Sequence, residues 1–320
     1  MNAPTIFTTP DGSISLQPKR GRLLGMAVGG HEFLWKPESV SAPWNLGGER
    51  LWFGPEADWF WKNTEKVDFD NYQVPGGLNP DKWTVTHRAE GSCSMELTLS
   101  LICSHSNAFL DLRIERHFNL LPNSARGIGV QADTMLHIEN GTLGQRVDLW
   151  SILQLPFGGH VRIPVIGTPS PRNYFDPCPS GEMTEDRGQF SVRIGGSAVF
   201  KIGLQPSQVI GRMAYVRSVG ASTLVLEREF PVHEGAPYCD SPLDALGSQG
   251  DAVQIFNDGG AHGCFGEMEH RSPALSCGTG PQSFSEATVT TARLLDVAQF
   301  ASWEDEFFTQ HRNRQPNNLP

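Results

Sequence analysis

The alternation of apolar and polar residues in one stretch decides the fold class: residues 94–103 read SMELTLSLIC, and residues 109–116 read FLDLRIER. Apolar side chains occupy every second position, with polar or charged side chains between them. A β-strand projects successive side chains to opposite faces, so each segment predicts a strand with one buried and one wet face. Strands of this kind are typical of antiparallel sheets packed face to face.

The same period continues outward along the chain. Phe190, Val192 and Ile194 alternate with polar residues, and so do the apolar positions of 224–229. Turn sequences separate the runs; they stand at 10–12, 75–77, 140–141, 195–196 and 257–260. The 34 Gly and 23 Pro residues are spread over all 320 positions, which indicates many short strands joined by turns. The sequence therefore predicts an all-β protein.

Helical periodicity is confined to the end of the chain. Phe300, Trp303 and Phe307 fall at i, i+3 and i+7, which predicts a terminal helix over 297–312 followed by a polar tail, 313–320.

No linker, charge block or low-complexity segment divides the chain, so we expect a single domain with its core at about 10–296. The segments 38–83 and 231–251 are long enough to form a binding site or a lid.

Composition excludes several classes of partner. The formal net charge is -10, with no basic surface in evidence, so nucleic acid is not an expected partner. The N-terminus lacks a basic region followed by an apolar run, and no stretch reaches the roughly 18 apolar residues of a membrane helix. A cytoplasmic location without membrane partners is the expectation, and no oligomeric state is predicted.

The cysteine pattern predicts neither a metal site nor a disulfide framework. The six cysteines are Cys93, Cys103, Cys178, Cys239, Cys264 and Cys277. None forms a CxxC pair, so buried thiols that act as small hydrophobic groups are the simplest interpretation. No phosphate-binding loop is present either, and no cofactor is expected.

Tryptophans mark the first candidate site, residues 44–61. Six of the eight tryptophans lie between Trp35 and Trp83. Indole faces cover the apolar faces of sugar rings, while polar side chains such as Arg50 and Glu56 bind the hydroxyl groups. The alternatives are a tryptophan wedge in the core and a plain ion pair between Arg50 and Glu49.

Three further segments carry polar residues in apolar surroundings. Residues 148–165 predict two strands joined by Phe157-Gly158-Gly159, with Gln154 and His160 flanking the turn. His160 could equally be an ordinary exposed histidine. Lys201 lies inside the apolar run 199–203 and, if buried, needs a carboxylate or a ligand as partner; otherwise it faces solvent at a strand edge.

Two acids stand two residues apart in the last segment, 265–275. In a strand, Glu267 and Glu269 share one face, and their repulsion in a cleft would raise one pKa toward neutrality. His270 points to the opposite face. The alternative is an exposed acidic face neutralised by Arg271.

These segments, in this order, resemble the galactose-mutarotase-like superfamily, and most of all its bacterial members of unassigned function, which are distant relatives of aldose 1-epimerases. The resemblance covers about 45–295 and includes the following motifs: Gly47-Gly48-Glu49-Arg50-Leu51-Trp52 with Pro55-Glu56, Trp150-Ser151-Ile152 with Ile163-Pro164, Phe200-Lys201-Ile202-Gly203 with Ala214-Tyr215, and Glu267-Met268-Glu269 with Pro273.

The resemblance implies an antiparallel β-supersandwich with a shallow cleft for a small sugar or short glycan. It implies an aldose mutarotase or epimerase in which Glu269, or else Glu267, is the general base. The expected substrate-binding residues are Arg50, Trp52, Glu56, Trp150, Gln154, Lys201, Tyr215 and His270.

In the epimerases, a histidine protonates the ring oxygen of the sugar. The strand that carries this histidine is replaced in this sequence by the segment around Trp150, which has no histidine at that place. His160, His270 and Lys201 are the candidates for that acid. Two other functions stay open: a non-catalytic carbohydrate-binding protein, and a lyase or hydrolase on glycosides in which Arg50 would neutralise a uronate.

Overall fold

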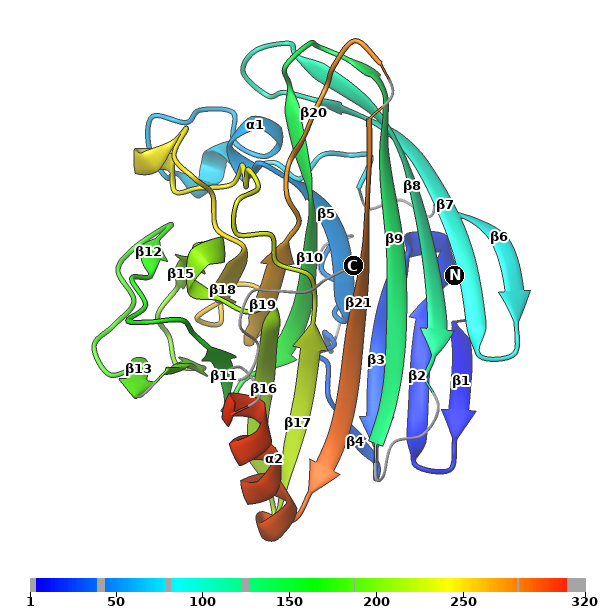
Figure 1. Ribbon diagram of the computed structural model, residues 1–320, viewed down its shortest axis with the longest axis vertical. Coiled ribbons are helices and arrows are strands. Elements are labelled where there is room, and N and C mark those ends of the chain that lie inside the picture. The colour runs from blue at the N-terminus through cyan, green and yellow to red at the C-terminus, as the bar shows by residue number, and fades with distance from the viewer. Residues whose placement is uncertain are drawn as a thin grey trace.

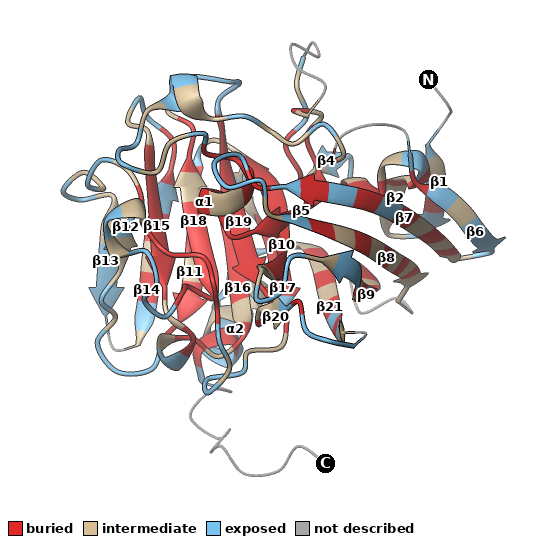
Figure 2. Ribbon diagram, turned by 90° about the horizontal axis from the view of Figure 1, so that it is seen from above, coloured by how far each residue is buried: buried red, intermediate tan, exposed pale blue. Residues whose placement is uncertain are grey.

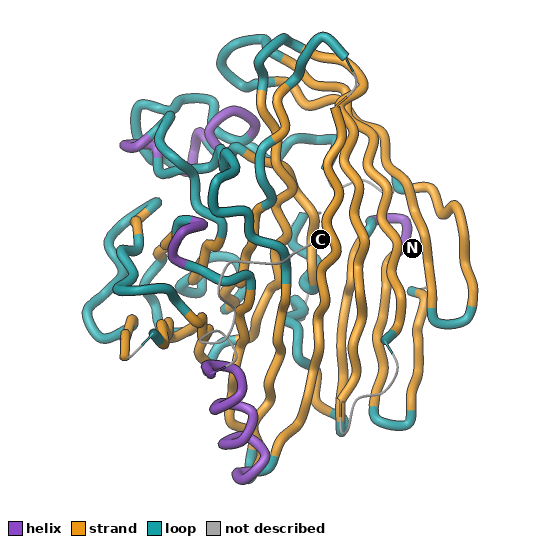
Figure 3. Tube along the Cα trace, viewed as in Figure 1, coloured by secondary structure: helices purple, strands orange, loops and turns teal. Residues whose placement is uncertain are grey.

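The computed structural model describes residues 4–38, 44–78, 82–121, 127–186, 188–280 and 282–309. Within these residues the chain forms three antiparallel sheets and few helices (Figure 1, Figure 3). The predicted all-β class is confirmed.

The smallest sheet comes from the N-terminal residues and has the order β1-β2-β3-β4. Its strands are β1 (Thr5–Thr9), β2 (Gly12–Gln17), β3 (Arg22–Val28) and β4 (His31–Glu32). Paired strands therefore begin at Thr5, earlier than the expected start of the core.

The largest sheet contains ten strands and includes the stretch that predicted the fold class. In spatial order the strands are β13 (Met183–Asp186), β14 (Gln189–Ile194), β11 (Gly159–Pro164), β16 (Arg212–Val219), β17 (Ser222–Glu229), β21 (Gln282–Leu295), β9 (Gly127–Gly141), β8 (Phe109–Leu120), β7 (Ser92–Ile102) and β6 (Thr84–Ala89). Buried residues alternate with half-buried or exposed ones along β7 and β8, as the sequence predicts (Figure 2).

The third sheet positions the candidate site. Its strands are β12 (Arg172–Asn173), β15 (Phe200–Leu204), β18 (Val253–Asn257), β19 (Phe265–Arg271), β10 (Arg146–Pro156) and β20 (Leu275–Ser276), and β5 (Glu49–Gly54) pairs with β10. β10 is thus bonded to β19 on one side and to β5 on the other.

The central strands of this third sheet are buried on both faces. β5 and β19 are buried at every position, and β10 at all but its two end residues. One face packs against the large sheet, while loops and side chains cover the other. The alternation predicted for residues 224–229 is not found, because β17 is buried at every position from Leu224 to Arg228.

The helices are short. They are α1 (Glu56–Trp59), α2 (Val297–Thr309) and 3-10 turns at Pro18–Arg20, Phe69–Asn71, Pro206–Gln208 and Leu243–Ala245. α2 packs Trp303 and Phe307 on the outer face of β16 and β17, and the Trp303 indole donates to Glu227 (3.0 Å). The predicted terminal helix is confirmed as far as Thr309; residues 310–312 and the predicted tail, 313–320, lie outside the described residues.

Among the residues that the structure describes, no helix is long and apolar enough to cross a membrane.

Candidate functional site

Strand register gathers polar residues on one face of the third sheet. Glu269 lies opposite Ile152, which lies opposite Arg50. Lys201 lies opposite Phe256, which lies opposite Glu267. Because directly paired residues point to the same side, both acids and both cations face away from the large sheet.

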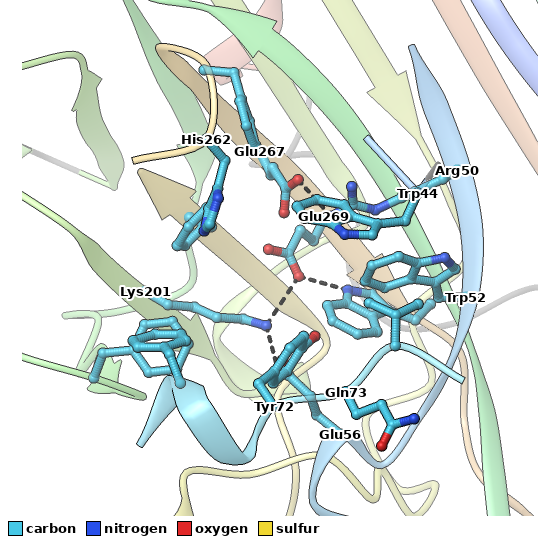
Figure 4. A pocket seen from close by; sticks show the side chains of 16 residues that line it. Trp44, Arg50, Trp52, Glu56, Tyr72, Gln73, Lys201, His262, Glu267 and Glu269 are labelled. Carbon is cyan, nitrogen blue, oxygen red and sulfur yellow. Dashed lines mark hydrogen bonds and ion pairs between the residues drawn. The ribbon is translucent and has the colours of Figure 1, made fainter. Parts of the chain in front are cut away.

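This face forms the floor of a cavity of about 440 Å³ (Figure 4). Its lining is largely aromatic, with ionised groups at the centre. The lining residues are Trp44, Arg50, Trp52, Glu56, Phe69, Tyr72, Gln73, Val74, Trp150, Phe175, Lys201, Phe256, His262, Phe265, Glu267 and Glu269.

Glu269 is fully buried and has one bonded and one unbonded oxygen. Its Oε2 accepts a hydrogen bond from the Trp150 indole (2.6 Å) and lies 3.4 Å from Nζ of Lys201. Its Oε1 has no partner among the described residues. Such an oxygen is available to a group on a ligand, since a buried acceptor is normally satisfied.

Glu267 lies two residues before Glu269 on β19 and has other bonding partners. Its Oε1 accepts from Arg50 (2.7 Å) and from Gln154 (3.1 Å). Burial and the neighbouring charge of Glu269 outweigh Arg50 and raise the pKa of Glu267 to about 7. Glu267 can therefore hold a proton near neutral pH, as a general acid must.

Lys201 is 2% exposed and joins the carboxylates of two chain segments. Its Nζ lies 2.9 Å from Glu56 Oε2, and it sits 4.4 Å from the centre of the Trp150 ring. Burial lowers its pKa, but Glu269 and Glu56 more than offset this, so the pKa of Lys201 is raised and the group stays cationic. The solvent-facing alternative for Lys201 is excluded.

Aromatic rings form the walls. The Arg50 guanidinium lies 4.0 Å from the Trp52 ring centre and 5.5 Å from that of Trp44. Arg271 lies 4.1 Å from the Trp150 ring and pairs with Asp148 and Asp240. Arg271 therefore does not neutralise the two acids, and the exposed-face interpretation of Glu267 and Glu269 is wrong.

Most of the predicted site residues meet in this cavity. Those that line it are Arg50, Trp52, Glu56, Trp150, Lys201, Glu267 and Glu269. Gln154 lies behind Glu267 and also donates to Asn45 (3.0 Å), so it positions the acid. The tryptophan-wedge alternative holds for Trp59 and Trp61, which are buried outside the cavity lining.

Three predicted residues lie elsewhere, and their placement in the cleft is corrected. The turn at Phe157-Gly158 carries the chain from β10 to β11 in the large sheet, where His160 lines a separate hollow beside Glu304. Tyr215 belongs to the same sheet, and its hydroxyl bonds to the Pro156 carbonyl (2.5 Å).

His270 is the third of these residues. It lies on β19 but faces the interior between the sheets, where it stacks on Phe230 and lies 3.3 Å from Glu286. The sequence had placed its side chain opposite the two acids, and this is confirmed. A contact with the same ligand is thereby excluded.

Several lining residues were not predicted. Burial, the neighbouring charge of Glu56 and a side-chain hydrogen bond to Glu56 raise the pKa of Tyr72 well above its usual value. His262 is exposed at the cavity edge, 5.7 Å from Trp44 between ring centres. Tyr72 lies within the long segment 38–83 that the sequence marked as a binding loop; no pattern marked His262.

The opposite face of the same strands holds a second polar cluster, between the two large sheets. Glu49 is fully buried and accepts from Arg116 (3.0 Å), Arg228 (3.1 Å) and Ser151 (3.0 Å). Despite burial, which raises it, the two arginines lower the pKa of Glu49 to about 2. Glu49 therefore pairs with these residues and not with its neighbour Arg50.

The sheet architecture and the cavity define the class: the chain has the galactose-mutarotase-like fold, as the sequence resemblance implied. Solved structures with this fold include an Escherichia coli K12 protein assigned as an aldose 1-epimerase (TM-score 0.57, 9% identity, 92% of this chain and 99% of that chain). A galactose mutarotase-like protein from Lactobacillus casei gives a TM-score of 0.53 at 9% identity, over 91% of this chain and 100% of that one. A Klebsiella pneumoniae protein assigned as an aldose 1-epimerase gives 0.52 at 13%, over 96% and 82%.

Comparisons of sequence cover a smaller part of the chain than the comparisons of structure. Residues 31–139 match the model of a family of unknown function (DUF6786). No curated protein matches the chain.

Proposed function

We propose that the protein interconverts the anomers of a sugar, as an aldose mutarotase or epimerase does. The observation that carries this proposal is the pair Glu267 and Glu269, which share one face of β19 in a cavity walled by aromatic rings, with an unbonded oxygen on Glu269 and a raised pKa on Glu267. Aromatic walls suit the apolar faces of a sugar ring, and the shared fold supports a carbohydrate ligand.

Glu269 acts as the general base in this proposal. Its unbonded Oε1 takes the proton of the anomeric hydroxyl while Lys201 and Trp150 hold Oε2. The bond between the anomeric carbon and the ring oxygen then breaks, and the open-chain aldehyde forms. By holding Oε2, Lys201 and the Trp150 indole keep Oε1 oriented toward the hydroxyl while the carboxylate takes up the proton.

Glu267 acts as the general acid. Arg50 and Gln154 both bind its Oε1, which leaves Oε2 to carry a proton to the ring oxygen. After rotation about the bond between the first two carbons, the ring hydroxyl returns its proton to Glu267 and attacks the other face of the aldehyde. Glu269 then returns the first proton to the new hydroxyl, so both acids regain their starting states.

The first test uses the unmodified protein. A thermal-shift panel of aldoses, uronic acids, sugar phosphates and short glycosides should give at least one ligand that raises the Tm. With that sugar, exchange spectroscopy by NMR should show anomer interconversion faster than in buffer, in proportion to protein concentration. Binding without acceleration would contradict the proposal.

A non-catalytic sugar-binding protein is the second candidate. The observation in its favour is that the cavity ions already pair with one another, Arg50 with Glu267 and Lys201 with Glu56. A site with paired ions can bind the hydroxyl groups of a sugar without catalysing a reaction. The NMR exchange measurement separates the two functions, because a binding protein would not accelerate anomer interconversion.

The rate should depend on pH because the acid must be protonated. With the pKa of Glu267 at about 7, the protonated fraction falls as pH rises through neutrality, so the enzyme-dependent rate should decline above about pH 7. Anomer exchange is measured from about pH 5 to about pH 9, with the buffer rate subtracted. In Glu267→Gln this decline should vanish together with most of the rate; a wild-type rate that keeps rising with pH would contradict the role of Glu267 as the acid.

A further inference from the structure

Away from the cavity floor, three metal-binding side chains of different types meet beside α1. Asp58 comes from α1, and Cys103 and His105 come from the turn between β7 and β8. Their donor atoms all lie within 4.8 Å of one another. We propose that Asp58, Cys103 and His105 form a binding site for a divalent transition metal ion of the zinc type.

Two of the separations between donor atoms are close to those around such an ion. Zinc bonds of about 2.0–2.3 Å at tetrahedral angles place donor atoms about 3.3–3.8 Å apart. Cys103 Sγ lies 3.7 Å from His105 Nε2, and that nitrogen lies 3.9 Å from Asp58 Oδ1. The last distance is too long for a hydrogen bond, so the two groups face each other without one.

Surrounding hydrogen bonds hold the donors in place independently of an ion. Gln145 donates to Asp58 Oδ2 (2.6 Å), which leaves Oδ1 toward His105. The backbone nitrogen of Ser104 donates to the Asp58 carbonyl (3.0 Å), and that of Cys103 to the Ala108 carbonyl (2.7 Å). A partner such as Gln145, which orients a ligand through its second atom, is usual around metal ligands, and the two backbone bonds hold the turn against α1.

The exposure of the site and the chemistry of its donor atoms restrict which metal ions could bind there. His105 is exposed while Cys103 is 4% exposed, so an ion has a path to a thiolate that is otherwise covered. His105 Nε2 forms a hydrogen bond with the Ala57 carbonyl (3.2 Å), which an ion bound to that nitrogen would replace. A thiolate with an imidazole and a carboxylate favours Zn²⁺ or Co²⁺ over Mg²⁺ or Ca²⁺.

The spacing of Asp58, Cys103 and His105 along the sequence does not indicate a metal site. Cys103 and His105 are separated by one residue, and Asp58 is far away along the chain, so no metal-binding pattern appears. An ion here would bind the β7–β8 turn to α1, whose first residue, Glu56, holds Lys201 in the cavity. The proposal does not depend on the reaction proposed above.

Titration of the reduced, metal-free protein with Co²⁺ tests the site. We expect one Co²⁺ per chain and a thiolate-to-metal charge-transfer band in the near ultraviolet. The band should be lost in Cys103→Ser and weakened in His105→Gln, a change of an exposed residue that leaves the core intact. The control Cys264→Ser removes an exposed thiol outside the group and should leave the band unchanged.

Thermal unfolding gives a second measurement. Zn²⁺ should raise the Tm of the wild type in a concentration-dependent way, and much less in His105→Gln. Absence of the band in the wild type, or a band that survives Cys103→Ser and disappears in Cys264→Ser, would overturn the proposal.

Discussion

Replacing Glu269 with glutamine is expected to lower the rate of anomer exchange by about 10²- to 10⁴-fold, the usual contribution of general acid–base catalysis. The amide matches the carboxylate in shape but cannot take a proton from the anomeric hydroxyl. The rate is measured by NMR exchange at saturating sugar, and folding is checked by circular dichroism. Because the walls of the cavity stay in place, binding of the sugar should persist.

Glu56→Gln is the matched control. It removes the other carboxylate that contacts Lys201, at 2.9 Å, without touching the proposed base. If Glu269 acts only by pairing with Lys201, both variants should lose similar activity. The proposed role requires a much larger loss in Glu269→Gln, and an undiminished rate there would rule it out.

The second large effect concerns stability. Glu49→Gln should lower the free energy of unfolding by about 3–5 kcal/mol, because the change leaves Arg116 and Arg228 buried without their counter-charge. Both arginines are about 2% exposed or less, so water does not replace the lost partner. Urea unfolding followed by fluorescence measures the difference.

Glu115→Gln is the control for this prediction. Glu115 also pairs with an arginine, Arg113, but its side chain is 47% exposed, and surface pairs contribute about 0–1 kcal/mol. Equal losses in the two variants would contradict the account of Glu49.

The pH dependence has a definite sign. The folded-state pKa of Glu49 is lowered from 4.5 to about 2, so its stabilisation is present above about pH 4.5 and is lost as pH falls toward 2. The difference between wild type and Glu49→Gln should therefore shrink over that range.

Local patterns predicted the strands well because side-chain alternation is a local property. The runs in β7, β8 and β14 were predicted from period two alone, and Glu267 and Glu269 were placed on one face by the same rule. Long-range arrangement was not accessible in this way. His160 and Gln154 flank one turn, yet that turn joins two sheets, so only Gln154 comes near the acids.

The missed residues have a common cause. Phe175, Phe256 and His262 line the cavity from segments whose local sequence carries no unusual pattern. Only the pairing of β15 with β18 and the fold of the covering segments bring them to Glu267. The same holds for Asp58 beside Cys103.

The strands β5, β10 and β19 carry the cavity groups and the groups between the sheets at alternating positions, as Arg50 follows Glu49. A single residue inserted into or deleted from one of these strands would turn its cavity side chains toward the space between the sheets and the others toward the cavity. Both the cavity and the packing between the sheets would be lost. The segments that cover the cavity, such as 62–78, carry no such constraint. In evolution, the strands can change only by substitution, whereas the covering segments can change in length. We therefore expect a change of ligand preference among descendants of this protein to arise first from changes in those segments.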